Sequence, residues 1–159
     1  MKETPDLIRD SSVGRELTEK EAMTLAGLMS THTLEDGEFL IKEGTRDNAL
    51  HVLLEGRLEV IKLVGGNDEM SLAILKAGDM AGELGFVDGQ AHTVGLRALS
   101  GARVISLSRT DFETIVDKHP QLVYKVMRAI VRSTHRIVHR MNHEFIELNN
   151  YVFKQHGRY

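Results

Sequence analysis

The segment that follows Pro120 constrains the fold of this chain more than any other feature. Neither proline nor glycine interrupts the sequence between Pro120 and Gly157, and proline is favoured at the first position of a helix. About 36 residues at roughly 1.5 Å each would form a helix on the order of 54 Å long. A small domain needs far less helix to cover it, so residues 119–159 are predicted to form a separate long C-terminal helix.

The predicted helix carries one apolar stripe along most of its length. Ile130 and Ile137 widen the stripe, and its other members follow a strict spacing of four and three residues: Met127, Val131, Thr134, Val138, Met141, Phe145, Leu148 and Val152. Such a heptad seam is typical of helices that pair with another helix. We therefore predict a homodimer through the 119–152 helix. Packing on the chain's own domain would account only for the first turns of the stripe.

The opposite face of the same helix is basic. It carries an arginine at every fourth position and three histidines: Arg128, Arg132, Arg136, Arg140, His135, His139 and His143. Residues 119–159 hold seven Lys/Arg and two acids, whereas the rest of the chain holds 13 basic and 21 acidic residues. Two interpretations remain open: a solvated face that meets the acidic body, or a surface for nucleic acid or an acidic partner.

Three residues of this face have the spacing of a metal clamp. His139, His143 and Glu147 lie at i, i+4 and i+8 of the predicted helix. Two ligands one turn apart do not make a site without others, and the adjacent arginines disfavour a cation. We therefore expect no metal site.

Between residues 31 and 108 the pattern changes to short strands that glycines separate. Six strands are predicted: Phe39–Lys42, Ala49–Glu55, Arg57–Val64, Met70–Leu75, Thr93–Ala98 and Arg103–Ser108. Apolar residues alternate with more polar ones, as in half-buried strands, at Val52, Leu54, Leu58, Val60, Leu72 and Ile74. Residues 65–68, Gly-Gly-Asn-Asp, are typical of a hairpin turn. This pattern predicts an α+β fold built on an antiparallel β-roll of the jelly-roll (double-stranded β-helix) type.

Short helices are expected to flank the roll. Residues 17–29 form one, with Thr18 and Glu21 as a capping box, and Ser108 caps another. Residues 1–16 lack periodicity and are expected to form a loose or partly docked arm. The chain thus divides into an arm at 1–16, a β-roll domain at 17–118 and the long helix at 119–159.

One acid stands inside the most glycine-rich segment of the chain. Residues 78–85 read Gly-Asp-Met-Ala-Gly-Glu-Leu-Gly, and the acid is Glu83. Glycines allow positive φ and a close approach of a ligand to backbone N–H groups, which suits an anion. A carboxylate would repel a bare phosphate, but it can accept a hydrogen bond from a ribose hydroxyl. The segment therefore suggests a site for a sugar phosphate.

The order of these features resembles the cyclic nucleotide-binding domain, as found in the catabolite activator family of bacterial regulators. The resemblance covers roughly residues 17–150, and its most specific segments are LEDGEFLIKEGTRDNALHVLLEGRLEV (34–60) and AGDMAGELGF (77–86). It implies that Glu83 binds the ribose 2′-OH and that backbone N–H groups from Gly82 to Leu84 hold the cyclic phosphate. Cyclic AMP and cyclic GMP are the implied ligands.

The family places an arginine, followed by a small or hydroxyl residue, about nine positions after this glutamate. Here His92 stands where the arginine is expected, and Thr93 supplies the hydroxyl. Arginine is always charged, whereas histidine is mostly neutral near pH 7 unless its pKa is raised. A bound phosphate would raise that pKa and make binding sensitive to pH. Arg97 could replace the missing charge only across a bulge, because a regular strand turns it away from position 92.

Three interpretations of the site follow. The pocket binds a cyclic nucleotide in an altered way through Glu83, His92 and Thr93, or it binds a different small anion. Alternatively, it has lost its ligand, and the chain persists as a dimerisation and interaction module. In each case the output passes to a separate effector protein.

Catalysis and DNA binding are not expected. The chain has no cysteine, no nucleophile–base pair is evident, and His51 is interpreted as a hydrogen-bonded residue of the roll. Related regulators carry a helix-turn-helix domain after the long helix, and the sequence ends at Tyr159 without one. A polar N-terminus and the lack of a long apolar run predict neither a signal peptide nor a membrane span, which favours the cytoplasm.

Overall fold

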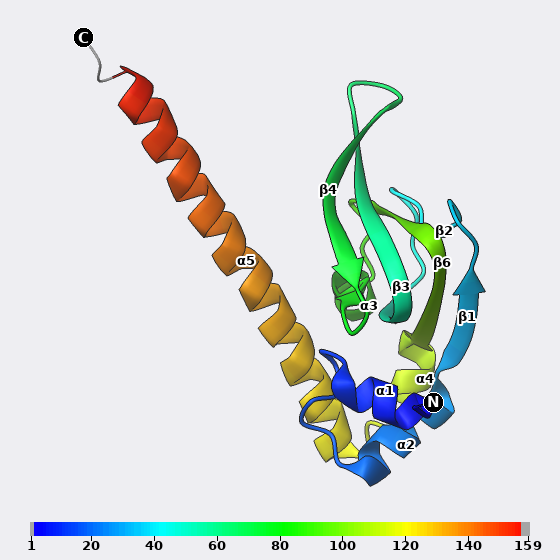
Figure 1. The fold of residues 1–159 in the computed structure, drawn as a ribbon. Helices are drawn as coiled ribbons and strands as arrows, with labels where there is room; N and C mark the ends of the chain where they lie inside the picture. The colour runs from blue at the N-terminus through cyan, green and yellow to red at the C-terminus, as the bar shows by residue number, and fades with distance from the viewer. Residues whose placement is uncertain (1, 157–159) are drawn as a thin grey trace.

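The computed structural model describes residues 2–156 and confirms the predicted α+β fold, a β-roll with flanking helices (Figure 1). The elements follow in this order: α1 (Thr4–Asp10), α2 (Glu19–Leu28), β1 (Ser30–Leu34), β2 (Phe39–Ile41), β3 (Ala49–Val64), β4 (Asp68–Lys76), β5 (Met80–Ala81), α3 (Glu83–Asp88), β6 (Gly95–Ser108), α4 (Arg109–Glu113) and α5 (Pro120–His156). Helices α1, α2 and α4 gather at one end of the roll, and α5 leads away from that end (Figure 1).

One antiparallel sheet of six strands forms the roll. Its strand order is β1-β6-β3-β4, with β2 also paired to β6 and β5 to β3. The two long strands run side by side from the pair Ala49–Ser108 to the pair Ile61–Gly95. Together β3 and β6 therefore form the backbone of the roll, and the shorter strands attach to them.

Gly56 bends β3 without ending it. Two strands were predicted here, 49–55 and 57–64, but the structure has one strand whose register with β6 shifts between Leu53 and Arg57. Gly56 has φ 86°, and a Cβ at this position would overlap the carbonyl oxygen of Gly101. A glycine in this conformation lets a strand bulge and curve while pairing continues on both sides.

Strand β6 likewise joins two predicted strands into one. The predicted strands 93–98 and 103–108 fall on one strand, Gly95–Ser108, which turns through Ser100 at φ 62°, while residues 93 and 94 belong to the preceding loop. Strand β1 was not predicted, because its residues Ser-Thr-His-Thr-Leu show little apolar alternation and only Leu34 is buried. Its pairing with β6, rather than a buried face, stabilises it.

The outward face of β4 differs from the prediction. Val52, Leu54 and Leu58 of β3 are buried as expected, but Leu72 and Ile74 are 51% and 52% exposed. Strand β4 lies at the end of the strand order and pairs only with β3 in the described chain. The alternation of apolar and polar residues in this strand was correctly predicted, but the apolar side chains of Leu72 and Ile74 point away from the interior.

The N-terminal segment is more ordered than expected. Residues 4–10 form α1, which packs on α2, and the side chain of Ile8 is fully buried. The hydroxyl of Ser11 donates to the carbonyl oxygen of Ile8 at 2.6 Å and closes the helix. A few buried contacts, among them that of Val13, hold this segment. Because they do not repeat at helical spacing, the sequence pattern did not predict the helix.

The predicted helix caps are confirmed. Thr18 and Glu21 form a reciprocal capping box at the start of α2, with distances of 3.2 and 3.0 Å. Ser108 accepts a hydrogen bond from the backbone of Asp111 and begins α4. Pro120 is the first residue of α5, as the sequence predicted.

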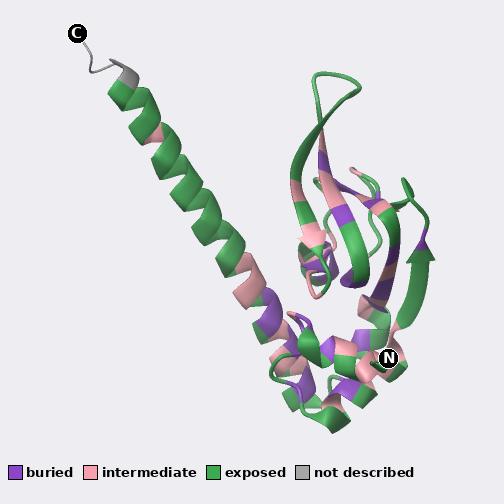
Figure 2. Cartoon of the chain, in the orientation of Figure 1, coloured by how far each residue is buried: buried purple, intermediate pink, exposed green. Residues whose placement is uncertain are grey.

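Only the first turns of α5 pack on the body of the protein. Leu122, Val126 and Ile130 are buried, whereas Val131 and Phe145 of the apolar stripe are both 65% exposed. Figure 2 shows the same change from buried to exposed residues along the helix. Among residues 2–156, no helix is both long enough and apolar enough to cross a membrane.

Ion pairs fix the base of α5 to the N-terminal segments. The Lys125 ammonium lies 2.6 Å from a carboxylate oxygen of Glu21 on α2. Arg132 and Arg128 both reach Glu16, which precedes α2. The first part of the basic face therefore meets the acidic body, in keeping with the first of the two interpretations of that face.

Candidate functional site

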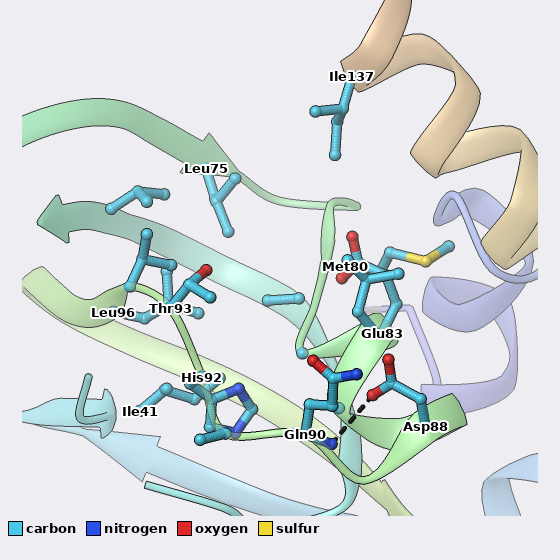
Figure 3. Close-up of a pocket in the computed structure, with 17 residues that line it drawn as sticks. Ile41, Leu75, Met80, Glu83, Asp88, Gln90, His92, Thr93, Leu96 and Ile137 are labelled. Carbon is cyan, nitrogen blue, oxygen red and sulfur yellow. Dashed lines mark hydrogen bonds between the residues drawn. The ribbon is translucent and has the colours of Figure 1, made fainter. Parts of the chain in front are cut away.

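A pocket of about 280 Å³ opens between the roll and α5 (Figure 3). Strands β2 to β6, helix α3, the loop at 90–94 and Ile137 of α5 line it. All five residues predicted to bind a ligand are among its lining residues: Gly82, Glu83, Leu84, His92 and Thr93. Small-molecule sites have volumes of roughly 300–1,000 Å³, so this pocket lies just below the lower end of that range.

The glycine-rich segment forms β5 and the start of α3. Gly82 is the N-cap of α3 and has φ 74°, which is the left-handed region. A Cβ at this position would lie 2.8 Å from the carbonyl oxygen of Ala49 and 3.2 Å from the His51 ring. Only glycine fits both this conformation and this space. The chain can therefore turn sharply from β5 into α3 at the wall of the pocket.

Glu83 is the first residue of α3, and its side chain is partly buried in the pocket wall. Burial raises the pKa of its carboxyl group, because the charged form is less well solvated there. Leu84 is 59% exposed and contributes an apolar edge to the same wall. Because the Glu83 carboxyl group is partly shielded from water, it is suited to accept a hydrogen bond from a hydroxyl group of a ligand.

The His92 ring forms a hydrogen bond with a carboxylate that was not predicted from the sequence. Its Nε2 lies 2.8 Å from Oδ1 of Asp47, in the loop before β3. The other oxygen of the same carboxylate, Oδ2, lies 2.7 Å from Nε2 of His51. Asp47 is part of the 34–60 segment that resembles the family, but no pattern in that segment separates it from the other acids. Only the fold brings residues 47 and 92 together.

The two histidines keep Asp47 ionised. Burial raises the pKa of the Asp47 carboxyl, but hydrogen bonds and charge from His51 and the hydrogen bond from His92 outweigh burial and lower the pKa to about 2. An ionised carboxylate only accepts, so Nε2 of each histidine must donate. The Nδ1 atom of His51 lies 2.6 Å from the Ser106 hydroxyl. His51 is thus a buried, hydrogen-bonded residue of the roll, as predicted.

Thr93 follows His92 in the same loop, and its side chain is exposed. The ammonium of Lys62 on β3 donates to the Thr93 carbonyl oxygen at 2.9 Å and to the Glu43 carboxylate at 2.6 Å. These contacts fasten the loop to the roll. Thr93 thus lines the pocket while Lys62 holds its carbonyl oxygen.

Arg97 does not supply the positive charge that is missing because His92 stands in place of the expected arginine. Its guanidinium donates to Glu59 at 2.9 Å and to Glu69 at 3.0 Å, and it lies over the ring of Phe39. The hydrogen bond to Glu59 and the charge of both acids raise its pKa. Arg97 is absent from the lining of the pocket, and within residues 2–156 no lysine or arginine lines it.

The residues with the spacing of a metal clamp, for which no metal site was expected, lie far along α5. His143 pairs with Glu147 at 3.2 Å, and both side chains are well exposed. Arg140 pairs with Glu144 on the same stretch. These are pairs along one helix surface, and they add no residue to the pocket.

Comparison with known proteins agrees with this geometry. The sequence model of the cyclic nucleotide-binding domain matches residues 31–119. The chain is 26% identical over 102 residues to the cAMP-activated global transcriptional regulator CRP of Salmonella typhimurium, a match that covers 64% of this chain and 49% of that regulator. It spans smaller shares, 6% and 14%, of two curated relatives that are enzymes, a lysophospholipase and a cGMP-dependent protein kinase.

Solved structures share the fold. A cyclic nucleotide-binding domain from Methylobacillus flagellatus aligns with a TM-score of 0.80 and 19% identity, over 91% of this chain and 81% of that one. The regulatory subunit of a cAMP-independent protein kinase A from Trypanosoma brucei, as a triple mutant bound to cAMP, aligns with a TM-score of 0.69 and 22% identity, over 81% and 45%. With more than half of its residues matched by the family model, the chain belongs to the cyclic nucleotide-binding domain family.

Proposed function

We propose that this chain is a regulatory sensor that binds a cyclic nucleotide, cyclic AMP or cyclic GMP, in the pocket beside α3 and acts as a dimer. One observation carries the proposal: residues from two separate segments, Glu83 and His92, line the same pocket of a cyclic nucleotide-binding fold. Glu83 accepts a hydrogen bond from the ribose 2′-OH. Backbone N–H groups from Gly82 to Leu84, with His92 and Thr93, hold the cyclic phosphate.

The remaining walls suit a purine base. Apolar side chains from five strands face the pocket, among them Val60, Leu75 and Leu96. Flat, apolar ligands gain free energy by leaving water for such a surface. Ile137 brings α5 to the same pocket, so a bound ligand and the position of the helix depend on each other.

The pattern of α5 supports the dimer. In the heptad seam, one core position is occupied by Val131, Val138, Phe145 and Val152, and the other by Met127, Thr134, Met141 and Leu148, so three of four residues at each position follow the pattern of a parallel dimer. β-Branched residues at the first position and unbranched or γ-branched residues at the second favour two parallel helices. Beyond Ile130 this stripe is largely exposed on the single chain, so the proposed cover is the same stripe of a second copy. An effector protein would then read the state of the dimer.

Calorimetry tests the ligand. We expect the unaltered chain to bind cyclic AMP or cyclic GMP, Glu83→Ala to weaken binding at least tenfold through loss of a hydrogen bond to a charged acceptor, and His92→Arg to strengthen it. His32→Arg, an exposed histidine on β1 outside the pocket, is the matched control and should leave affinity unchanged. No binding by either the unaltered chain or His92→Arg would refute the proposal.

A second function is favoured by one specific feature. Because no lysine or arginine lines the pocket in the described chain, the site is also suited to a module that dimerises and contacts partners without a nucleotide. The Trypanosoma relative is described as cAMP-independent, and its cAMP complex was formed with a mutant in which one change introduces an arginine. Binding by His92→Arg alone, with none by the unaltered chain, would support this second function.

A further inference from the structure

The pocket offers an anion only one side chain that can carry positive charge. Within residues 2–156, its lining contains the acids Glu83 and Asp88 and a single basic group, His92. Arg97 is held by acids outside the lining. A cyclic phosphate in this pocket therefore depends on the charge of His92, together with backbone N–H groups.

The contacts of His92 decide which ring nitrogen can face a ligand. Nε2 donates to Asp47, because the ionised carboxylate can only accept. Nδ1 lies on the side of α3, where a Cβ added to Gly85 would be 3.7 Å from it. No hydrogen bond to Nδ1 is found among the described residues. Nδ1 is therefore the ring nitrogen of this pocket-lining residue that has no hydrogen bond within the described chain.

The protonation of this nitrogen determines what it can bind. In the neutral ring, with the proton on Nε2, Nδ1 presents a lone pair that repels a phosphate oxygen. In the imidazolium, Nδ1 carries a proton and donates a charge-assisted hydrogen bond to an anion. Binding of a phosphate therefore requires uptake of a proton whenever His92 starts neutral.

On the basis of the proposed function, we propose that Asp47 is a positioning residue. It fixes the His92 ring through Nε2 and stabilises the imidazolium form of that ring, so that the cyclic phosphate binds together with a proton. The 2.7 Å contact to His51 ties the same carboxylate to the roll through Ser106. Asp47 therefore acts on the ligand through His92 and does not itself line the pocket.

Four other charged or titratable groups lie near His92 or its loop. Glu83 and Asp88 face the pocket from α3, and Asp88 accepts the backbone N–H of Gln90 at 3.0 Å. His51 reaches His92 only through Asp47, and Lys62 of β3 binds the carbonyl oxygen of the next residue, Thr93. Because Glu83 also titrates, Glu83→Gln serves to remove its contribution from the pH profile.

Proton uptake can be measured on the unaltered chain. Calorimetric titration with cyclic AMP and with cyclic GMP, from pH 5.5 to 8.5, is run in two buffers that differ in ionisation enthalpy. We expect up to one proton to be taken up for each ligand, and Kd to rise by up to about tenfold per pH unit over the range in which His92 is neutral in the free chain but protonated in the complex. Equal heats in both buffers and a flat profile would overturn the inference.

Asp47→Asn tests the role of the carboxylate. Asparagine keeps an oxygen for the Nε2 proton but removes the charge, so the midpoint of the pH profile should fall by about one unit or more. Asp117→Asn, an exposed acid outside the pocket lining, should leave the midpoint in place. An unchanged midpoint in Asp47→Asn contradicts the inference. Should that variant not fold, the two-buffer measurement above still tests proton uptake, and the absence of uptake overturns the inference.

The double variant separates this inference from the proposed function. In His92→Arg the profile should be flat, and Asp47→Asn added to it should not restore any dependence on pH. If neither the unaltered chain nor His92→Arg binds either nucleotide at any pH, the proposed function fails. If both bind and neither pH nor Asp47→Asn changes affinity, the proposed function stands and only the role of Asp47 is refuted.

Discussion

Single residues set the shape of the pocket wall, and Gly82 is the clearest case. Its left-handed φ of 74° and the nearby carbonyl oxygen of Ala49 leave no room for a side chain. Gly82→Ala should lower the free energy of unfolding by about 2 kcal/mol. Gly27→Ala is the matched control, because a Cβ on this exposed residue of α2 would meet nothing within 4 Å. It should be neutral or stabilising by up to about 1 kcal/mol. Urea unfolding of both variants gives the comparison.

The lowered pKa of Asp47 predicts how the free energy of unfolding changes in acid. Its pKa is about 2 in the folded chain and about 3.9 in an unfolded one. A carboxylate with a lowered pKa stabilises the fold above its unfolded pKa, and this contribution is lost as pH falls through the folded pKa. The contribution is on the order of 2 kcal/mol at most, since the side chain is partly exposed.

The measurement is the difference in unfolding free energy between the unaltered chain and Asp47→Asn. In acid the difference should shrink between about pH 4 and pH 2, where Asp47 becomes protonated first in the unfolded and then in the folded chain. A gap that stays constant to pH 2 would show that the carboxylate is not stabilised by His51 and His92. Asp117→Asn again provides an exposed comparison.

At the scale of elements, α5 combines two kinds of surface. Its first turns are buried against α2 and the roll, and its later turns expose the heptad seam. Val138→Glu or Met141→Glu would place a charge in the proposed helix pair and should produce monomers, as measured by sedimentation velocity. Asn150→Glu places the same charge on the outer face of the helix and should leave a dimer. A dimer that persists in Val138→Glu would contradict the proposed seam.

The sequence predicted elements wherever a local signal was sufficient. The starts of three helices were predicted correctly, because the residues that cap a helix act within one turn. These residues are Thr18 with Glu21, Ser108 and Pro120. Gly56 was misinterpreted as the end of a strand, because a glycine that bends a strand and one that ends it look the same in sequence. Glu83 and His92 line one pocket, as the resemblance implied, but the hydrogen bond between His92 and Asp47 spans 45 positions and depends on the closure of the roll.

The whole molecule consists of a packed body and a helix that leaves it. Hydrogen exchange of Val138→Glu should therefore show strong protection over residues 120–130 and weak protection over 131–154, since only the first part packs on the body. In the unaltered chain the second part should gain protection if a second copy covers it. Equal protection of both parts in a verified monomer would show that the later turns are stable on their own.

Strand β4 has a consequence for the behaviour of the protein at high concentration. It ends the sheet, its outward side chains Leu72 and Ile74 are half exposed, and residues 70–75 read Met-Ser-Leu-Ala-Ile-Leu without a charge. An uncharged edge strand of this kind is a template for cross-β aggregation between chains. Glu69 and Lys76 flank the run as charged gatekeepers, so the solubility of the domain depends on these two side chains and on whatever shields the edge between them.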